Sequence, residues 1–139
     1  MVNQTFYYGI IKMIKNVLVT GSNGGIGLAI VEKFLKNNYK VFAHYHKSKN
    51  NLSQLKSKHL VKIQADLSDL QECKELFGKC INSSSNLDSL INNAGAMIIS
   101  KDIEFINSDD YDYVMNLNLK APFILSQYAL NKMRKQKYG

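Results

Sequence analysis

A glycine-rich turn is the segment of this sequence best suited to bind a ligand. It consists of Thr20-Gly21-Ser22-Asn23-Gly24-Gly25-Ile26-Gly27, between a β-branched run and an amphipathic run. Glycines at such a place let the chain turn tightly, let the backbone approach a pyrophosphate, and let the next helix pack closely. The amides and dipole at the start of that helix favour negative charge. The spacing fits T-G-x-x-x-G-x-G and T-G-x-x-G-x-x-G equally, and a plain strand-to-helix turn is an alternative.

Polar residues also end two later strand-like runs. Asp66 follows the third run, and Asn92-Asn93-Ala94-Gly95 closes the fourth. Residues at such ends can face a ligand bound at the edge of a parallel sheet. Each also has a simpler interpretation, since Asp66 could cap the following helix and Asn93 could be a turn residue.

Short β-branched runs alternate with longer amphipathic segments along the chain. The alternation predicts strands over residues 15–20, 39–45, 60–65 and 87–92, and helices from 26 to a stop at Asn37-Asn38, over 51–58, over 69–81 and over 108–138. Ser108 is the expected N-cap of the last helix, which can consist of two segments meeting near Asn118. Strands separated by helices predict an α/β fold, a doubly wound parallel sheet with helices on both faces.

Length and composition indicate one globular domain. The chain has 139 residues, of which 45% are hydrophobic and 21% charged, and this excludes a disordered tail, a collagen-like fibre and a disulfide-stapled miniprotein. No apolar run reaches the ~18 residues that span a bilayer, so we expect a cytoplasmic protein without membrane contact. Residues 1–12 fit none of the predicted elements and are expected to be an N-terminal extension of a domain over 13–139. We expect no metal site.

The two cysteines are expected to be free. Cys73 and Cys80 lie seven residues apart in a predicted helix. This spacing places them on one face, about 10 Å apart, which is too far for a disulfide.

The net charge of +7 does not predict a nucleic-acid site. Residues 1–62 carry ten lysines and one acid, whereas residues 63–112 carry three lysines and ten acids. Arg134 is the single arginine in the sequence, although base-edge and bidentate phosphate recognition favours arginine. We therefore expect a solvated lysine surface and no nucleic-acid partner.

Together these motifs resemble the short-chain dehydrogenase/reductase family. The resemblance runs from about Ile14 to the last residue, and it includes Asn118 within Asn116-Leu117-Asn118-Leu119-Lys120-Ala121-Pro122-Phe123. The N-N-A-G motif selects the T-G-x-x-x-G-x-G spacing of the glycine turn. The resemblance implies a Rossmann-like sheet in the order 3-2-1-4 that lacks the family's later strands, so the domain over 13–139 is expected to be incomplete at its C-terminal end. The fourth strand would then keep an unpaired edge.

The resemblance also implies a nicotinamide dinucleotide cofactor and gives roles to named residues. Asn118 matches the catalytic asparagine of the family. The cofactor residues fall into three groups: Gly21, Asn23, Gly25, Ile26 and Gly27 line the pyrophosphate and ribose, Asp66 and Leu67 flank the adenine, and Asn93, Ala94 and Gly95 face the nicotinamide-side ribose.

The end of the second predicted strand favours NADP over NAD. NAD-binding sites of this kind usually place an acid there for the ribose 2′-hydroxyl, but the segment is Ala43-His44-Tyr45-His46-Lys47-Ser48-Lys49. Lys47, with Ser48 and His46, is suited to a 2′-phosphate. The alternative is that these are surface lysines, and the family's basic position in the glycine turn is occupied here by Gly24.

The remaining catalytic residues of the family have no match. The family uses a serine and a tyrosine with a lysine four residues later, and Y-x-x-x-K occurs here as Tyr8/Lys12, Tyr45/Lys49 and Tyr128/Lys132. None of these pairs has the expected position relative to Asn118. We therefore expect a fragment of an oxidoreductase that transfers hydride between NADP(H) and a small carbonyl or alcohol substrate, inactive alone. The alternative is a non-catalytic dinucleotide-binding module.

The last predicted helix carries more apolar residues than one buried face needs. They are Val114, Leu117, Phe123, Ile124, Leu125, Tyr128 and Leu130. The surplus is typical of a subunit interface, and we expect a homo-oligomer, a dimer or a tetramer, when the protein is complete.

Overall fold

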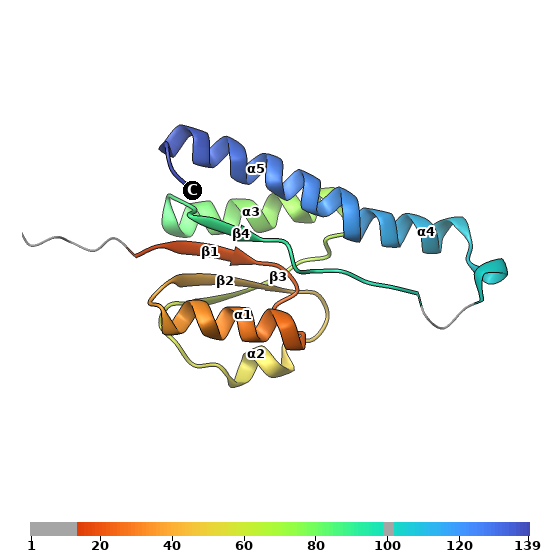
Figure 1. The fold of residues 1–139 in the computed structure, drawn as a ribbon, viewed down its shortest axis with the longest axis horizontal. Coiled ribbons are helices and arrows are strands. Elements are labelled where there is room, and N and C mark those ends of the chain that lie inside the picture. Colours follow the sequence, from red (N-terminus) through yellow and green to blue (C-terminus); the bar gives the residue numbers. More distant parts are fainter. Residues whose placement is uncertain (1–13, 99–101) are drawn as a thin grey trace, which may run out of the picture.

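Four parallel strands form one sheet at the centre of the molecule (Figure 1). The computed structural model describes residues 14–98 and 102–139. The strands are β1 (Asn16–Val19), β2 (Lys40–Tyr45), β3 (Leu60–Gln64) and β4 (Ser89–Ile91), in the spatial order β3-β2-β1-β4. The register pairs Leu18 with Phe42 of β2 and with Leu90 of β4. The predicted strand order is confirmed.

Helices cover both faces of this sheet. α1 and α2 lie against one face, and α3 and α5 lie against the other (Figure 1). The helical elements are α1 (Gly25–Lys36), α2 (Asn50–Gln54), α3 (Leu70–Ser84), a 3-10 turn (η1, Ile103–Phe105), α4 (Ser108–Met115), a π-helical turn (η2, Asn116–Lys120) and α5 (Ala121–Gln136). The doubly wound α/β fold is therefore confirmed.

The side chains of β1 alternate between the two faces of the sheet and contribute to the core on each side. Val17 and Val19 point to the side of α1 and α2, where they pack with Val31. Leu18 points to the opposite side and belongs to the cluster that contains Leu76 and Leu125. Because successive side chains of a strand alternate between its faces, a sheet covered on both sides needs such a continuous apolar run.

The ends of two helices differ from the sequence-based prediction. The last helical stretch is capped by Asn107 and not by Ser108, since the Asn107 side chain accepts from the Asp110 amide in a capping box. α3 runs on to Ser84 and ends at Ser85, whose φ of 60° is left-handed. The helix predicted over 69–81 is therefore three residues longer at its C-terminal end. α1 ends at Lys36 with Asn37 as its C-cap, which agrees with the predicted stop at Asn37-Asn38.

The outer face of the last helical stretch leaves large apolar side chains exposed. Leu119 and Phe123 are 61% and 60% exposed, while Leu125 and Ala129 are buried against the sheet. Among the described strands, β4 pairs with β1 alone and so forms one edge. The surplus of apolar residues is thus present, and the homo-oligomer stays a prediction. None of the described helices is both long enough and apolar enough to cross a membrane.

Both cysteines are free and buried in the core on the α3 side of the sheet. The Cys73 thiol donates to the carbonyl oxygen of Leu67 at 3.4 Å. Burial raises the pKa of Cys73 to about 11 and that of Cys80 to about 12. The thiolate, which is the reactive form, is therefore scarce in the folded protein.

We expect neither thiol of the folded chain to react with a disulfide reagent such as DTNB at pH 8. In guanidinium chloride we expect both cysteines to react at once, because unfolding removes the burial that raises their pKa. The release of thionitrobenzoate measures both states. Rapid labelling of the folded chain would contradict the packing of α3 described above.

Candidate functional site

Thr20 and Asn93 hold the carboxyl ends of β1 and β4 together. The Thr20 hydroxyl donates to Ile91 O at 3.3 Å and accepts from the amides of Asn93 and Ala94, both at 3.0 Å. The Asn93 side-chain amide donates to the carbonyls of Thr20 and Gly21 at 2.9 and 3.1 Å. Asn93 is therefore more than a turn residue, since its side chain spans the two loops that flank the site.

Two glycines of the turn are required by packing, and one faces open space. Gly21 has a left-handed φ of +65°, and a Cβ there would lie 2.8 Å from Ala94 Cα. A Cβ on Gly27 would lie 2.7 Å from Asn93 Nδ2 and 2.9 Å from the carbonyl carbon of Gly21. A Cβ on Gly25 would have no atom within 4 Å. Gly25 is thus the position where an approaching ligand, and not the fold, would require glycine.

The N-terminus of α1 has no cap of its own. Gly24 occupies the N-cap position without a side-chain hydrogen bond, and the first turn contains no acidic residue. Ile26 in this turn is 75% exposed. The first amides of a helix need partners from outside it, and an anion can supply them.

The Asn23 side chain stabilises α2. Its Oδ1 accepts from the amides of Asn51 and Leu52 at 3.0 and 3.2 Å, and its carbonyl accepts from the Asn51 side chain at 2.9 Å. These contacts fix the glycine turn to the segment after β2. The side chain of Asn23 is thus engaged within the protein, and the predicted role of this residue beside a cofactor stays a prediction.

His44, at the carboxyl end of β2, connects the glycine turn to β3. The ring is 2% exposed, its Nδ1 accepts from Gly21 N at 3.1 Å, and its Nε2 lies 2.9 Å from Ala65 O. Burial lowers the pKa of His44 more than the bond to Ala65 raises it. Sequence analysis gave this residue no role. The signal it missed is a polar residue inside an otherwise apolar buried strand.

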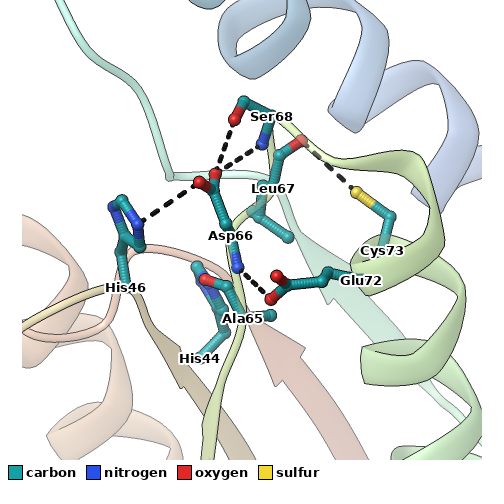
Figure 2. Close-up of polar contacts among 8 residues, drawn as sticks. All are labelled: His44, His46, Ala65, Asp66, Leu67, Ser68, Glu72 and Cys73. Carbon is teal, nitrogen blue, oxygen red and sulfur yellow. Dashed lines mark hydrogen bonds and ion pairs between the residues drawn. The ribbon is translucent and has the colours of Figure 1, made fainter.

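Asp66 lies at the centre of the polar contacts that Figure 2 shows. Its carboxylate accepts from the amide and hydroxyl of Ser68 at 2.9 and 2.7 Å, and lies 3.5 Å from His46 Nε2. Partial burial acts to raise the pKa of Asp66, but the Ser68 hydrogen bonds and the positive charges of His46 and Lys47 outweigh it and lower the pKa.

Asp66 does not cap α3. The N-cap is Asp69, whose carboxylate accepts from Gln71 N and Glu72 N. The Asp66 amide instead donates to Glu72 Oε2 at 2.7 Å (Figure 2). This leaves the Asp66 side chain pointing toward His46, on the side of the glycine turn.

A cavity of about 150 Å³ joins these loops at the carboxyl edge of the sheet. Five of the predicted cofactor residues line it, namely Gly21, Asp66, Leu67, Ala94 and Gly95, together with His44, His46, Ala96, Tyr113 and Leu117. The other predicted residues lie outside this lining, and Lys47 among them is exposed. The structure thus brings together residues from three separate loops.

Asn118 lies in the π-helical turn η2, beside this cavity. Its side-chain amide pairs in both directions with the backbone of Ala96, donating to O and accepting from N at 2.8 Å each. Ala96 lines the cavity. Asn118 therefore holds the segment after β4 against the helical layer.

Neither described Y-x-x-x-K pair lies beside Asn118. Tyr128 packs on Phe77 and lines, with Lys132, a groove between α3 and α5 that shares no lining residue with the cavity. The Lys49 ammonium lies 6.0 Å from the Tyr45 ring. Tyr8 and Lys12 fall outside the described residues. Within the described part of the chain, no cluster of three or more His, Cys, Asp or Glu could hold a metal ion.

Comparison with known proteins decides the family. A family model described as short chain dehydrogenase matches residues 15–139. The chain belongs to this family. The predicted family is therefore confirmed, and so is the Rossmann-like fold that it implied.

Individual short-chain dehydrogenases resemble the chain over most of its length. It is 36% identical over 128 residues to the 3-oxoacyl-acyl-carrier-protein reductase FabG of Rickettsia typhi, covering 90% of this chain and 51% of the relative. A solved 4-hydroxyisoleucine dehydrogenase complexed with NADH has a TM-score of 0.79 at 31% identity, covering 89% of this chain and 52% of that one. A blue fluorescent protein from a metagenomic library, in complex with NADPH, has a TM-score of 0.76 at 30% identity, covering 84% and 50%. The chain spans about half the length of the curated relatives it matches.

We expect Gly27→Ala to lower the free energy of unfolding by about 1–3 kcal/mol, because the added Cβ overlaps Gly21 and Asn93. Gly78→Ala in α3 is the matched control, since a Cβ there meets nothing within 4 Å. It should leave stability unchanged or raise it slightly. Urea denaturation measures both variants, and equal stabilities would contradict the close packing of the turn.

Proposed function

We propose that this chain is the NADP(H)-binding part of an oxidoreductase that transfers hydride between the cofactor and a small carbonyl or alcohol substrate, and that it is inactive alone. The observation that carries the proposal is the convergence of Gly21, Asp66 and Ala94 on one cavity beside an uncapped helix N-terminus. Ligands of open α/β sheets bind in such a crevice, where the connections of neighbouring strands lead to opposite faces. Membership of the short chain dehydrogenase family supports the reaction class.

The described residues fit the parts of a dinucleotide. The first amides of α1, from Gly25 to Gly27, would hold the pyrophosphate, and the open space at Gly25 admits its approach. Asp66 and Leu67 would flank the adenine. Asn93, Ala94 and Gly95 would face the nicotinamide-side ribose. When bound, the cofactor supplies or accepts the hydride, and these residues bind and orient it.

Asn118 would act in this chain by positioning. Its amide is engaged with the backbone of Ala96 on both sides, so it holds the loop from Asn93 to Ala96 at a fixed distance from η2. We propose that this is how the residue corresponding to the family's asparagine supports the reaction. Substitution by alanine would release the loop while leaving the glycine turn in place.

The end of β2 supports NADP over NAD. Lys47 and Ser48 are exposed beyond the last residue of the strand, where a 2′-phosphate would gain charge-assisted hydrogen bonds. The carboxylate of Asp66, which lies close to this segment, is engaged with Ser68 and His46. Solved relatives in complex with NADPH and with NADH support a nicotinamide dinucleotide of either kind.

A non-catalytic dinucleotide-binding module is the second candidate. It is favoured by the position of Tyr128, which packs in the α3–α5 groove and not beside Asn118. The two candidates differ in the coding sequence downstream of Gly139: the oxidoreductase requires a further strand, a serine and a Y-x-x-x-K pair there, and the binding module does not.

Gly25→Ala tests the cofactor site. We expect the variant to melt like the unmodified chain, because its Cβ meets no protein atom, and to bind NADP⁺ at least about tenfold more weakly, because that Cβ enters the space for the pyrophosphate. Calorimetric titration measures the affinity and thermal unfolding measures the stability. An unchanged affinity would refute the placement of the pyrophosphate at α1.

Lys47→Glu tests the cofactor preference. We expect about a tenfold or greater loss of affinity for NADP⁺ and little change for NAD⁺, because a charged hydrogen bond to the 2′-phosphate is replaced by repulsion. Lys79→Glu in α3 makes the same change of charge on the opposite side of the molecule and is the control. Equal losses for both nucleotides in a fluorescence titration would exclude Lys47 as the 2′-phosphate ligand.

A further inference from the structure

We propose that His44 is a positioning residue for the dinucleotide site, and that its neutral ring holds the glycine turn in the form that binds cofactor. Protonation of the ring would release the Gly21 peptide and weaken binding. The inference rests on the proposed function for its effect on affinity. The contact between His44 and Gly21 stands independently of that function.

The hydrogen bonds determine which ring nitrogen carries the proton. Gly21 N–H donates to Nδ1 at 3.1 Å, so Nδ1 must be unprotonated. Nε2 then carries the proton and donates to Ala65 O at 2.9 Å. A ring that is 2% exposed has no water to replace either partner. The geometry therefore requires one neutral tautomer.

His44 holds two successive amides of the glycine turn. The ring binds the Gly21 amide, and the His44 carbonyl accepts from the Ser22 amide at 2.8 Å. Gly21 is the residue with left-handed φ at which the chain turns, and its carbonyl accepts from the Gly24 amide. The conformation of the turn up to the start of α1 thus depends on the position of His44.

The same ring reaches the other side of the cavity. Ala65, its second partner, directly precedes Asp66 and Leu67, the residues proposed to flank the adenine. One side chain therefore contacts both the pyrophosphate side and the residue that precedes the adenine side. Gly21 and His44 both line the cavity that lies between these two sides of the site.

Protonation of His44 would place two hydrogen-bond donors against each other at Gly21. A charged imidazole has a donor at both nitrogens, so Nδ1–H would face the Gly21 N–H, and one of them must move. Three titratable groups face the ring: His46 beyond the end of β2, Asp66 after β3, and Glu72 in α3. His46 opposes protonation and the two carboxylates favour it, while burial outweighs them and lowers the pKa of His44.

The sign of the pH dependence follows from the lowered pKa of His44. With a pKa below the ordinary 6.5 in the folded chain, the ring is neutral above that pH and the turn is intact. As the pH falls below 6.5, protons bind His44 more readily in the unfolded or rearranged turn than in the intact one, and so favour the rearranged turn. The contact with Gly21 is lost once His44 in the folded chain becomes protonated.

Two substitutions separate the two hydrogen bonds. In His44→Asn, the side-chain oxygen can take the place of Nδ1 and accept from Gly21, and it does not titrate. In His44→Gln, the side-chain nitrogen can take the place of Nε2 and donate to Ala65, while the Gly21 amide loses its acceptor. The affinity for NADP⁺, which is stable in acid, is measured for the full chain and both variants from pH 8 down to the lowest pH at which circular dichroism shows the chain to be folded.

We expect His44→Asn to match the unmodified chain within about twofold at pH 8 and to bind more tightly than it at the acid end of the series, by a ratio that grows as the pH falls. His44→Gln should bind about fivefold more weakly than the unmodified chain at pH 8, the size of one net hydrogen bond. Titration of the 2′-phosphate affects all three proteins alike and cancels in these ratios. Identical pH dependences for the unmodified chain and His44→Asn, or full affinity of His44→Gln, would overturn the proposal.

The backbone amide resonance of Gly21 is a readout that needs no cofactor. Over the same pH series it should shift toward the acid end in the unmodified chain and stay in place in His44→Asn. If no protein binds NADP⁺ but the resonance behaves in this way, the proposed function fails while the His44 contact stands. If the resonance does not respond to pH in the unmodified chain, the positioning role is wrong whatever the affinity.

Discussion

The hydrogen bonds between Thr20 and Asn93 are the contact on which the site depends. The chain leaves β1 toward α1 on one face of the sheet, and leaves β4 toward α4 and α5 on the other. Neighbouring strands whose connections diverge in this way open a crevice at their carboxyl ends. The Thr20 hydroxyl and the Asn93 amide bridge that divergence, so the crevice has a fixed floor on which Gly21 and Gly27 pack.

Much of the fold was predictable because its signals are local. A strand covered on both faces must be apolar throughout, as in Val17-Leu18-Val19, and a glycine turn after it marks the start of α1. The ends of the last helical stretch were less predictable. Ser108 and Asn107 are both good caps, and the choice depends on Asp110 facing back toward Asn107. The π-helical turn was not predicted from the residues, and Asn118 within it pairs with Ala96, which is distant in sequence.

The candidate site was predictable as a set of strand ends, but not as a set of contacts. Parallel strands place Gly21, Asp66 and Ala94 at one edge, and this follows from their order along the chain. Two contacts depend on how β1, β2 and β3 are placed: Asn23 accepts from the amide of Asn51 in α2, and His44 joins Gly21 to Ala65. Register is a property of paired strands, which a single sequence does not display. A polar residue within an apolar strand, such as His44, is the sign of such a contact that the sequence itself contains.

The π-helical turn accommodates one extra residue between α4 and α5. A π turn contains about one residue more than an α turn, and each α-helical residue advances the chain by about 100°. Because the wider turn takes up the extra residue, Leu125 and Ala129 still face the sheet while Phe123 stays exposed. Removing one residue between Asn116 and Lys120 would therefore restore an ordinary α-helix with α5 in almost the same phase, whereas the same deletion within α5 would rotate every later residue by about 100°.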